Sequence, residues 1–385
     1  MSGRSIYLDY HATTPVDPRV LQAMLPYFTE VFGNPASASH AFGWKAQEAV
    51  ETARRQVAAL IGATAREIVF TSGATESNAW AIRGVTERPD SLRRRVVTSA
   101  IEHKSVLEAY GRLAEQGWDV VIVPVDRGGR VRLDELERAV TPETALVSVM
   151  AANNEIGAVQ PLADIGRIAR ANGAVFHVDG AQAVGKVPID VNAMNIDLLS
   201  LTGHKLYGPK GCGALFVRKR TELIPLITGG GQERGMRAGT LNVPGIVGLG
   251  CACEICRKDM TEENARLSRL RDRLLQGLTD GVDGVVVNGT LAHRLPHNLH
   301  VSFERVEGEK VLMGIGNIAV SSGSACQSAS GKPSHVLAAI WGEDAVPSAS
   351  FRFGIGRTTT EDDIDYVIET FTTVVRKMRE LSPVH

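Results

Sequence analysis

The chain has 385 residues, with 42 Lys and Arg against 43 Asp and Glu, which gives a formal net charge of −1. This balance gives no reason to expect nucleic acid or an anionic membrane surface as a partner. The length suits one large domain and a smaller one, and no apolar run approaches the roughly 20 residues that span a bilayer.

The N-terminal residues and the cysteine content both point to the cytoplasm. Residues Met1–Asp9 contain neither the apolar core of a secretory signal nor a long leader rich in Arg and Ser. The five cysteines, an odd number in a long chain, do not form the pattern of a disulfide framework. We therefore expect a cytoplasmic protein in a reducing environment.

Short apolar runs alternate with segments of helical periodicity over the first part of the chain. This rhythm predicts a layered α/β domain in which a mainly parallel seven-stranded sheet lies between helices. The helical spacing is clear over Ala46–Leu60 and Ile165–Ala171. The predicted strands are Ile68–Phe70, Val96–Ser99, Val120–Val123, Ala145–Val149, Ala174–Val178, Leu198–Leu201 and Ala214–Val217.

The sequence changes character after about Cys256. A charged helix over Glu262–Leu278, whose first part is a candidate hinge, and a closing helix over Asp362–Leu381 enclose several short apolar runs. This pattern predicts a smaller α+β domain. Its predicted strands are Val285–Asn288, His297–Phe303, Ile318–Ser321 and Ser350–Gly354. We assign residues 15–256 to the large domain, and residues 1–14 with 257–385 to the small one.

Three cysteines, Cys251, Cys253 and Cys256, lie close together in the sequence. No second ligand cluster at zinc-finger spacing accompanies them, and the segment continues an apolar helical run that begins at Ile246. We therefore expect thiols packed along a helix and no metal site.

A phosphate-binding turn is predicted where the first strand ends. The residues that follow, Thr71-Ser72-Gly73-Ala74-Thr75, are small, and a helix starts among them. Free N–H groups and the dipole at a helix N-terminus favour an anion such as phosphate. The alternative is that Ser72 or Thr75 only caps the helix.

Two further strand ends carry a carboxylate and a lysine. Asp179 ends one apolar strand, and Lys205 follows another in a turn rich in Gly and Pro. In a parallel sheet both lie at the same edge as the phosphate turn. Asp179 could keep a pyridine nitrogen protonated, and Lys205 could form a Schiff base with pyridoxal phosphate (PLP). The alternatives are that Asp179 caps the next helix and that Lys210 is the reactive lysine, although we expect Lys210 to be an ordinary loop residue.

Together these motifs resemble the fold-type I PLP enzymes of the class V aminotransferase group. Within that group the chain is similar to the group I cysteine desulfurases, which serve nitrogenase or general iron–sulfur assembly. The resemblance runs from Ile6 to Arg357. Its most specific segments are Ala152–Gly157, Gly203–Lys205, Arg237–Thr240 and Ser321–Cys326.

The resemblance implies a role in cofactor binding for several positions. Asp179 would pair with the pyridine nitrogen, Gln182 with the ring hydroxyl oxygen, and Lys205 would carry the cofactor. Asn154 would also contact it. The phosphate would be held by Ala74, Thr75, Thr202, His204 and, from a partner subunit, Thr240. The last contribution implies a homodimer.

The resemblance also implies roles around the substrate. His103 would stack on the pyridine ring and act as an acid/base group, and Asn154 and Arg352 would bind the substrate carboxylate, which suits a guanidinium group. Taken alone, His103 could be structural and Arg352 an ordinary ion-pair residue. The remaining histidines are expected to be structural; they include His177, His297 and His335.

Cys326 is the candidate nucleophile. It lies in the segment 321–332, a run of small residues that should pack little and move easily. A thiol on such a segment can reach both a substrate and an acceptor, whereas a buried cysteine prefers apolar neighbours.

The resemblance thus implies a cysteine desulfurase that converts L-cysteine to L-alanine and leaves a persulfide on Cys326. A sulfur-acceptor protein, such as an iron–sulfur scaffold, would collect the sulfur for iron–sulfur clusters or other thio-cofactors. The alternatives are a selenocysteine lyase, another PLP-dependent lyase or aminotransferase, and a catalytically silent scaffold or regulator. The presence of Lys205, Asp179, His103 and Cys326 together argues against the last of these.

Overall fold

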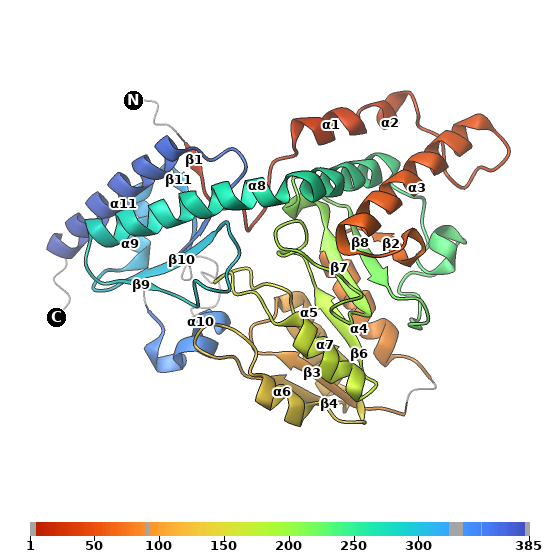
Figure 1. Ribbon diagram of the computed structural model, residues 1–385, viewed down its shortest axis with the longest axis horizontal. Coiled ribbons are helices and arrows are strands. Elements are labelled where there is room, and N and C mark those ends of the chain that lie inside the picture. Colours follow the sequence, from red (N-terminus) through yellow and green to blue (C-terminus); the bar gives the residue numbers. More distant parts are fainter. Residues whose placement is uncertain (1–4, 90–91, 323–333, 348, 382–385) are drawn as a thin grey trace.

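The computed structural model describes residues 5–89, 92–322, 334–347 and 349–381 (Figure 1). Its largest element is a seven-stranded sheet, and the predicted α/β fold is confirmed. The strands lie in the order β2 (Ile68–Thr71), β8 (Gly213–Val217), β7 (Leu198–Thr202), β6 (Val175–Asp179), β5 (Thr144–Ser148), β3 (Arg95–Ser99) and β4 (Asp119–Val123). Strand β8 runs antiparallel to both neighbours, and the pairs from β7 to β4 are parallel.

Helices cover both faces of this sheet because consecutive residues of each strand point to opposite sides. Leu198 and Leu215 face the helices α4 (Ala74–Thr86) and α5 (Lys104–Glu115). Their neighbours Leu199 and Phe216 join the core on the other face. That core is covered by α3 (Ala41–Ile61), α6 (Leu133–Ala139), α7 (Leu162–Ala171) and the first half of α8 (Val243–Gly281). Every strand except the edge strand β4, in which Ile122 is exposed, is therefore buried on both sides, which explains the continuous apolar runs in the sequence.

Helix α8 is one continuous helix of 39 residues that links two hydrophobic cores (Figure 1). Leu249 and Cys253 pack into the core of the large sheet, whereas Leu267 and Leu274 pack into a second core. The helix predicted over Glu262–Leu278 is therefore the second half of a longer one, and the residues of the candidate hinge are helical throughout.

The second core is built around a four-stranded antiparallel sheet. Its strands lie in the order β12 (Ser321–Ser322), β13 (Ser350–Gly354), β10 (Asn298–Phe303) and β9 (Val285–Val287). The helices α9 (Gly308–Ile315) and α11 (Glu361–Leu381) pack beside α8 over this core, and β1 (Ile6–Tyr7) pairs with β11 (Ile318–Ala319). The single strand predicted over Ile318–Ser321 is therefore two short strands with different partners.

The remaining helices lie beside the first core. The short helices α1 (Pro18–Met24) and α2 (Pro26–Thr29) contact α8. Helix α10 (His335–Trp341) also contributes Val336, Leu337 and Ile340 to the first core. The domain boundaries expected from the sequence stay a prediction.

Two of the three neighbouring cysteines share the buried face of α8, and the third lies away from it. Cys253 and Cys256 are buried in the first core, and burial raises the pKa of both thiols, whereas Cys251 is partly exposed. Across the described ranges, no three His, Cys, Asp or Glu side chains are grouped as a metal site requires. In the same part of the chain, no helix has both the length and the apolarity needed to cross a membrane.

Candidate active site

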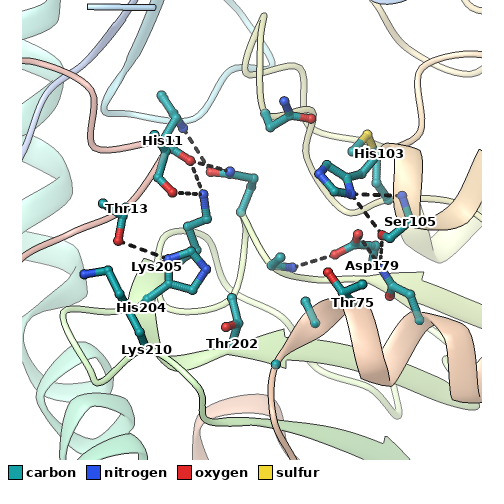
Figure 2. A pocket seen from close by; sticks show the side chains of 18 of the residues that line it. His11, Thr13, Thr75, His103, Ser105, Asp179, Thr202, His204, Lys205 and Lys210 are labelled. Atoms are coloured by element: carbon teal, nitrogen blue, oxygen red, sulfur yellow. Dashed lines mark hydrogen bonds between the residues drawn. The ribbon is translucent and has the colours of Figure 1, made fainter. Parts of the chain in front are cut away.

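A cavity of about 710 Å³ opens at the edge of the large sheet where β2, β6 and β7 end. These three strands point the same way, because β8 is antiparallel to both β2 and β7 and β6 is parallel to β7. Their carboxyl ends therefore meet at one edge, and the phosphate turn, Asp179 and Lys205 all line the cavity. Figure 2 shows Lys205 and His11 on one side of it and His103, Ser105 and Asp179 on the other.

The turn after β2 leaves the N-terminus of α4 open to the cavity. Gly73 is the residue before the helix, and among the described residues no side chain caps it, so neither Ser72 nor Thr75 acts as the cap. Instead, the Glu76 carboxylate accepts a hydrogen bond from the backbone N–H of Ser72 at 2.8 Å. The first-turn N–H groups of a helix lack intrahelical partners, and here they line a cavity. This is the arrangement that binds phosphate in many proteins.

Two glycines let the neighbouring strand pass close to this turn. A Cβ atom on Gly213, at the start of β8, would lie 2.6 Å from the Cα of Gly73 and 2.5 Å from the carbonyl oxygen of Leu201. Neither backbone could yield without displacing the turn. Thr202 is also near, since a Cβ on Gly73 would lie 3.5 Å from the Thr202 hydroxyl oxygen.

Asp179 is held at the end of β6 by two donors. Its Oδ2 accepts a hydrogen bond from the Asn78 amide at 2.8 Å, and its Oδ1 accepts one from the backbone N–H of Ala181 at 3.0 Å. The bond from Ala181 closes a turn, and because a turn and not a helix follows β6, the helix-cap alternative from the sequence is wrong. The same carboxylate lines the cavity, so the turn contact and a role toward a ligand coexist in one side chain.

His103 precedes α5 and caps that helix. Its Nδ1 accepts a hydrogen bond from the backbone N–H of Ser105 at 3.1 Å and lies 2.9 Å from the Ser105 hydroxyl oxygen. The ring is exposed to the cavity, where it lies across from Lys205 (Figure 2).

Lys205 lies in the 3-10 turn Gly203–Lys205, directly after β7, and its side chain reaches the N-terminal segment. Its Nζ donates hydrogen bonds to the backbone carbonyl oxygens of His11 and Ala12, the second at 2.7 Å. Burial, followed by the nearby Arg352 guanidinium, lowers the pKa of Lys205 to about 8. Lys210 lines the same cavity but is exposed.

Gln182 and His11 form a second hydrogen-bonded wall. The Gln182 amide N–H donates to the His11 carbonyl oxygen at 3.0 Å, and Gln182 Oε1 lies 3.0 Å from His11 Nδ1. The Asn298 amide lies 3.0 Å from His11 Nε2, and the His297 ring stacks on His11 at 4.4 Å. Burial lowers the pKa of His11 well below its usual value, so the ring is neutral. Because the Asn298 amide donates to Nε2, the proton of His11 lies on Nδ1.

Arg352, on β13, reaches the cavity from the second core. Its Nη2 donates hydrogen bonds to Asp9 and to the Ser321 hydroxyl, both at 2.7 Å, and its Nη1 donates to the Asn154 carbonyl oxygen at 3.0 Å. Its Nε is buried and has no hydrogen-bond partner among the described residues. Arg352 is therefore both the ion-pair residue that the sequence allowed and a cationic wall of the cavity with an unused donor.

A smaller cavity of about 170 Å³ adjoins the first on the side of Arg352. The two cavities share His103, Asn154 and Arg352. The smaller one is also lined by Ser321 and Ser322, which begin the candidate cysteine segment in the sequence, and by Ser334, which follows it.

His204 completes the cavity near Lys205. Its Nδ1 lies 3.2 Å from the Thr13 hydroxyl oxygen. Burial, followed by the charges of Lys205 and Lys210, lowers the pKa of His204 to about 4. The ring is therefore neutral at physiological pH and can offer one N–H donor.

Ten of the twelve site residues predicted from the sequence line the main cavity. They are Ala74, Thr75, His103, Asn154, Asp179, Gln182, Thr202, His204, Lys205 and Arg352. Thr240 does not line the main cavity of its own chain and is exposed. Cys326 lies outside the described residues.

Several residues that line the cavity or hold one of its walls were missed from the sequence. His11, Thr13 and Asp9 come from the N-terminal segment, which the second core positions, and nothing in their local sequence indicates chemistry. Asn78 had a detectable signal, since it lies four residues after Ala74 and therefore on the same face of α4.

Glu102, next to His103, is also a missed residue of this region. It is fully buried, and its Oε1 accepts hydrogen bonds from the Ser99 hydroxyl at 2.5 Å and the Met150 backbone N–H at 2.9 Å. Burial raises the pKa of Glu102 to about 8, so its carboxyl group is mostly neutral at pH 7. It joins the ends of β3 and β5 beneath the turn that carries His103.

Known proteins share this sequence and this fold over nearly the whole chain. Residues 6–367 match the family described as "Aminotransferase class-V". "Cysteine desulfurase IscS" of Anaeromyxobacter dehalogenans (strain 2CP-C) is 54% identical over 99% of this chain and 95% of its own. A solved structure named "NIFS-LIKE PROTEIN" superposes with a TM-score of 0.91 at 38% identity, over 97% of this chain and 100% of the other. Another, "SspA in complex with cysteine", gives a TM-score of 0.80 at 39% identity, over 91% and 99%.

Proposed function

The chain belongs to the class-V aminotransferase family and, within it, is a cysteine desulfurase, and from this premise we propose that it moves the sulfur of L-cysteine onto Cys326 with PLP bound in the main cavity. The observation that carries the proposal is the convergence of four groups on one cavity. These are the open N-terminus of α4, the carboxylate of Asp179, the buried amine of Lys205 and the guanidinium of Arg352.

The residues present suit PLP, the cofactor of this family. The uncapped helix α4 supports phosphate binding at Ala74 and Thr75, with Thr202 and His204 close to the same turn. Asp179 keeps an acceptor for a pyridinium N–H, and Gln182 is held by His11 for the ring hydroxyl. His103 offers its ring as a stacking surface, and Asn154 lines the same space. When bound there, PLP supplies an electron sink that stabilises negative charge on the substrate Cα.

Lys205 moves the proton at the substrate Cα. With its pKa lowered to about 8, an appreciable fraction of the amine is unprotonated near neutral pH and can accept that proton. The carbonyl oxygens of His11 and Ala12 accept hydrogen bonds from Nζ and so fix its position within the cavity. His103 lies on the opposite side and can exchange protons with the substrate from there.

The substrate carboxylate is bound by Arg352 with help from Asn154. The Arg352 guanidinium lines the main cavity, and because the side chain is largely buried, a charge-assisted bond from it to a carboxylate oxygen is strengthened. L-cysteine as the substrate is supported by the solved relative whose title names a complex with cysteine.

The thiolate of Cys326 attacks the sulfur of the bound cysteine. A bond forms between the two sulfur atoms while the Cβ–S bond of the substrate breaks, and its electron pair stays with the substrate carbon, which is protonated to give alanine. Cys326 is left as a persulfide. The small cavity beside Arg352 supports this approach, because Ser321 and Ser322, which begin the Cys326 segment, and Ser334, which follows it, all line this cavity.

The working form is a homodimer in which Thr240 of each chain completes the phosphate site of the other. Thr240 is exposed and does not line its own main cavity. Exposed aromatic side chains on α2, on α3 and in the loop between them also support a second copy as a partner; they are Phe28, Phe32, Phe42 and Trp44, each at least 55% exposed. We further propose a cytoplasmic location and an iron–sulfur scaffold or similar acceptor protein.

The dimer is tested by mixing two inactive variants, Lys205→Ala and Thr240→Ala. A mixed dimer then contains one site with both residues intact, and activity should reappear on subunit exchange. Mixtures that stay inactive although exchange is shown by mass would contradict the shared site.

The reaction is tested by measuring alanine and sulfide from L-cysteine with a reducing thiol, in the native protein and in Cys326→Ala. Both products from the native protein and neither from the variant support the desulfurase. Alanine and sulfide undiminished in Cys326→Ala would instead indicate a direct lyase, and alanine from neither would indicate another substrate.

A further inference from the structure

A buried asparagine on α4 links the two residues that face the cofactor ring from different elements. Asn78 is fully buried, and its side-chain Nδ2 donates one hydrogen bond to Asp179 at 2.8 Å and another to the Ser105 hydroxyl oxygen at 2.9 Å. The Ser105 hydroxyl in turn lies 2.9 Å from His103 Nδ1. A chain of hydrogen bonds therefore runs from Asp179 through Asn78 and Ser105 to His103. Figure 2 labels Asp179, Ser105 and His103 of this chain.

The orientation of the Asn78 amide is fixed by the charge of Asp179. Both N–H groups are used, while Oδ1 is buried without a hydrogen-bond partner among the described residues. Turning the amide over would place Oδ1 against a carboxylate oxygen, which is repulsive. A buried carbonyl oxygen without a partner is itself unfavourable, so the side chain keeps an arrangement that is costly for folding alone.

The proton positions along the chain follow from the donors at its two ends. The Asn78 amide donates to the Ser105 oxygen, so the hydroxyl proton is free to point at His103 Nδ1. The backbone N–H of Ser105 also donates to that nitrogen. Because both of its neighbours donate, Nδ1 must be unprotonated, and the neutral ring carries its proton on Nε2.

We propose that Asn78 is a positioning residue that fixes the Asp179 carboxylate and, through Ser105, holds His103 as the Nε2–H tautomer. This inference rests on the proposed function, since it assigns Asn78 to the PLP site of that reaction. The two groups that face the cofactor ring are thereby oriented by one amide, although they come from β6 and from the start of α5.

The test compares Asn78→Ala, Asn78→Asp and Ser105→Ala with the native holoprotein. Asn78→Asp keeps the shape but places an anionic or protonated oxygen beside Asp179, and Ser105→Ala removes the hydroxyl while keeping the backbone donor. Thr86→Val is the matched control, because the buried Thr86 hydroxyl lies on the same helix and, within the described part of the chain, bonds to the Ile82 carbonyl oxygen alone.

The first readout is the dissociation constant for PLP together with the visible circular dichroism of the bound cofactor. Loss of a hydrogen bond to a charged acceptor should weaken PLP binding roughly 10- to 100-fold in Asn78→Ala, and at least as much in Asn78→Asp. The dichroism should change with it, because the ring is no longer fixed by Asp179. Thr86→Val should bind PLP as the native protein does, and Ser105→Ala, which keeps the bond from Asn78 to Asp179, should weaken binding less than Asn78→Ala.

The second readout is nitrogen NMR of holoprotein labelled in histidine, with the His103 signals identified by their loss in His103→Gln. The native protein should show an unprotonated Nδ1 and a protonated Nε2. In both Ser105→Ala and Asn78→Ala the Nδ1 signal should shift toward the position of an unprotonated nitrogen that accepts a weaker hydrogen bond.

Native-like PLP binding and dichroism in Asn78→Ala, or a proton on Nδ1 of neutral His103, would overturn the inference alone. Failure of the native protein to bind PLP would overturn the proposed function as well.

Discussion

The Nζ of Lys205 lies 2.7 Å from the carbonyl oxygen of Ala12, a residue 193 positions earlier in the chain. The lysine in the turn after β7 is thus held by a segment that the second core positions. The same segment supplies Asp9 to Arg352 and His11 to Gln182. The cavity is therefore built by both cores, and the N-terminal segment is the wall that joins the lysine to the arginine.

The amine of Lys205 should lose its proton near pH 8, and the pH at which it does so should depend on Arg352. In cofactor-free protein, acetylation of Lys205 by acetic anhydride should rise through a pH of about 8, because only the unprotonated amine reacts. Arg352→Gln removes a cation that lowers this pKa, so the rise should move to higher pH. Peptide mass spectrometry measures the modification. Arg138→Gln, on the exposed face of α6, serves as the control, and identical profiles for all three proteins would contradict the coupling.

Arg352→Lys should weaken substrate binding more than it slows turnover. The guanidinium serves Asp9, Ser321 and the Asn154 carbonyl at once, and a lysine ammonium cannot span these acceptors and also bind a carboxylate. We expect KM for L-cysteine to rise roughly 10- to 100-fold, with a smaller fall in kcat.

Arg273→Lys is the matched control for this change, because Arg273 forms a two-bond pair with Asp365 on the exposed surface. It should leave KM unaltered, since exposed ion pairs contribute little. A native KM in Arg352→Lys would show that the substrate carboxylate binds elsewhere.

Gly213→Ala should destabilise the protein and impair PLP binding. The added Cβ would meet the backbone of Gly73 and Leu201 below 3 Å, so the phosphate turn must shift. The free energy of unfolding should fall by about 1–3 kcal/mol or more, as overpacking does. Chemical denaturation and PLP titration measure the two effects.

Gly111→Ala provides the opposite case for comparison. Gly111 lies in α5, and a Cβ there has nothing within 4 Å. This change should stabilise the protein by up to ~1 kcal/mol through helix propensity and leave PLP binding intact. Equal effects from the two glycine substitutions would contradict the close approach of β8 to the turn.

Glu102→Gln should alter how stability depends on pH. The pKa of Glu102 is raised from 4.5 to about 8 in the folded protein, so between these values the folded chain holds a proton that the unfolded chain has lost. The native free energy of unfolding therefore falls as pH rises through this window, and Glu102→Gln removes that fall. Denaturation at several pH values should show that the free energy of unfolding of the variant rises relative to that of the native protein as the pH increases. Parallel curves would indicate an ionised Glu102.

Much of the large sheet could be predicted, because strands buried on both faces leave continuous apolar runs. The run Leu198–Leu201 became β7, for example, with only its last residue missed. The same pattern brought the ends of β2, β6 and β7 to one edge, and with them the phosphate turn, Asp179 and Lys205.

The length of α8 could not be predicted from its sequence. Its periodicity is helical on both sides of Cys256, but the composition changes because the two halves enter different cores. The two strands β11 and β12 were likewise merged, since only their pairing with different partners separates Ile318–Ala319 from Ser321–Ser322. Both errors concern contacts between distant parts of the chain.

The hydrogen-bond partners within the site were the least predictable feature. Asp9 and His11 come near Arg352 and Gln182 only because β1 and β11 hold the N-terminal segment beside β13. The place of Asn78 on the cavity side of α4 could have been predicted, because helical spacing puts it beside Ala74. Its bond to Asp179 could not, because that bond depends on the packing of α4 against β6.

The most direct test of the account is a single turnover without reducing thiol, followed by mass spectrometry of every cysteine-containing peptide. With one equivalent of L-cysteine per chain, the Cys326 peptide should gain one sulfur atom, and an equal amount of alanine should be released. Lys205→Ala should yield neither product. Alanine formed without sulfur on Cys326, or sulfur found on Cys251 instead, would contradict the proposal that Cys326 receives the sulfur.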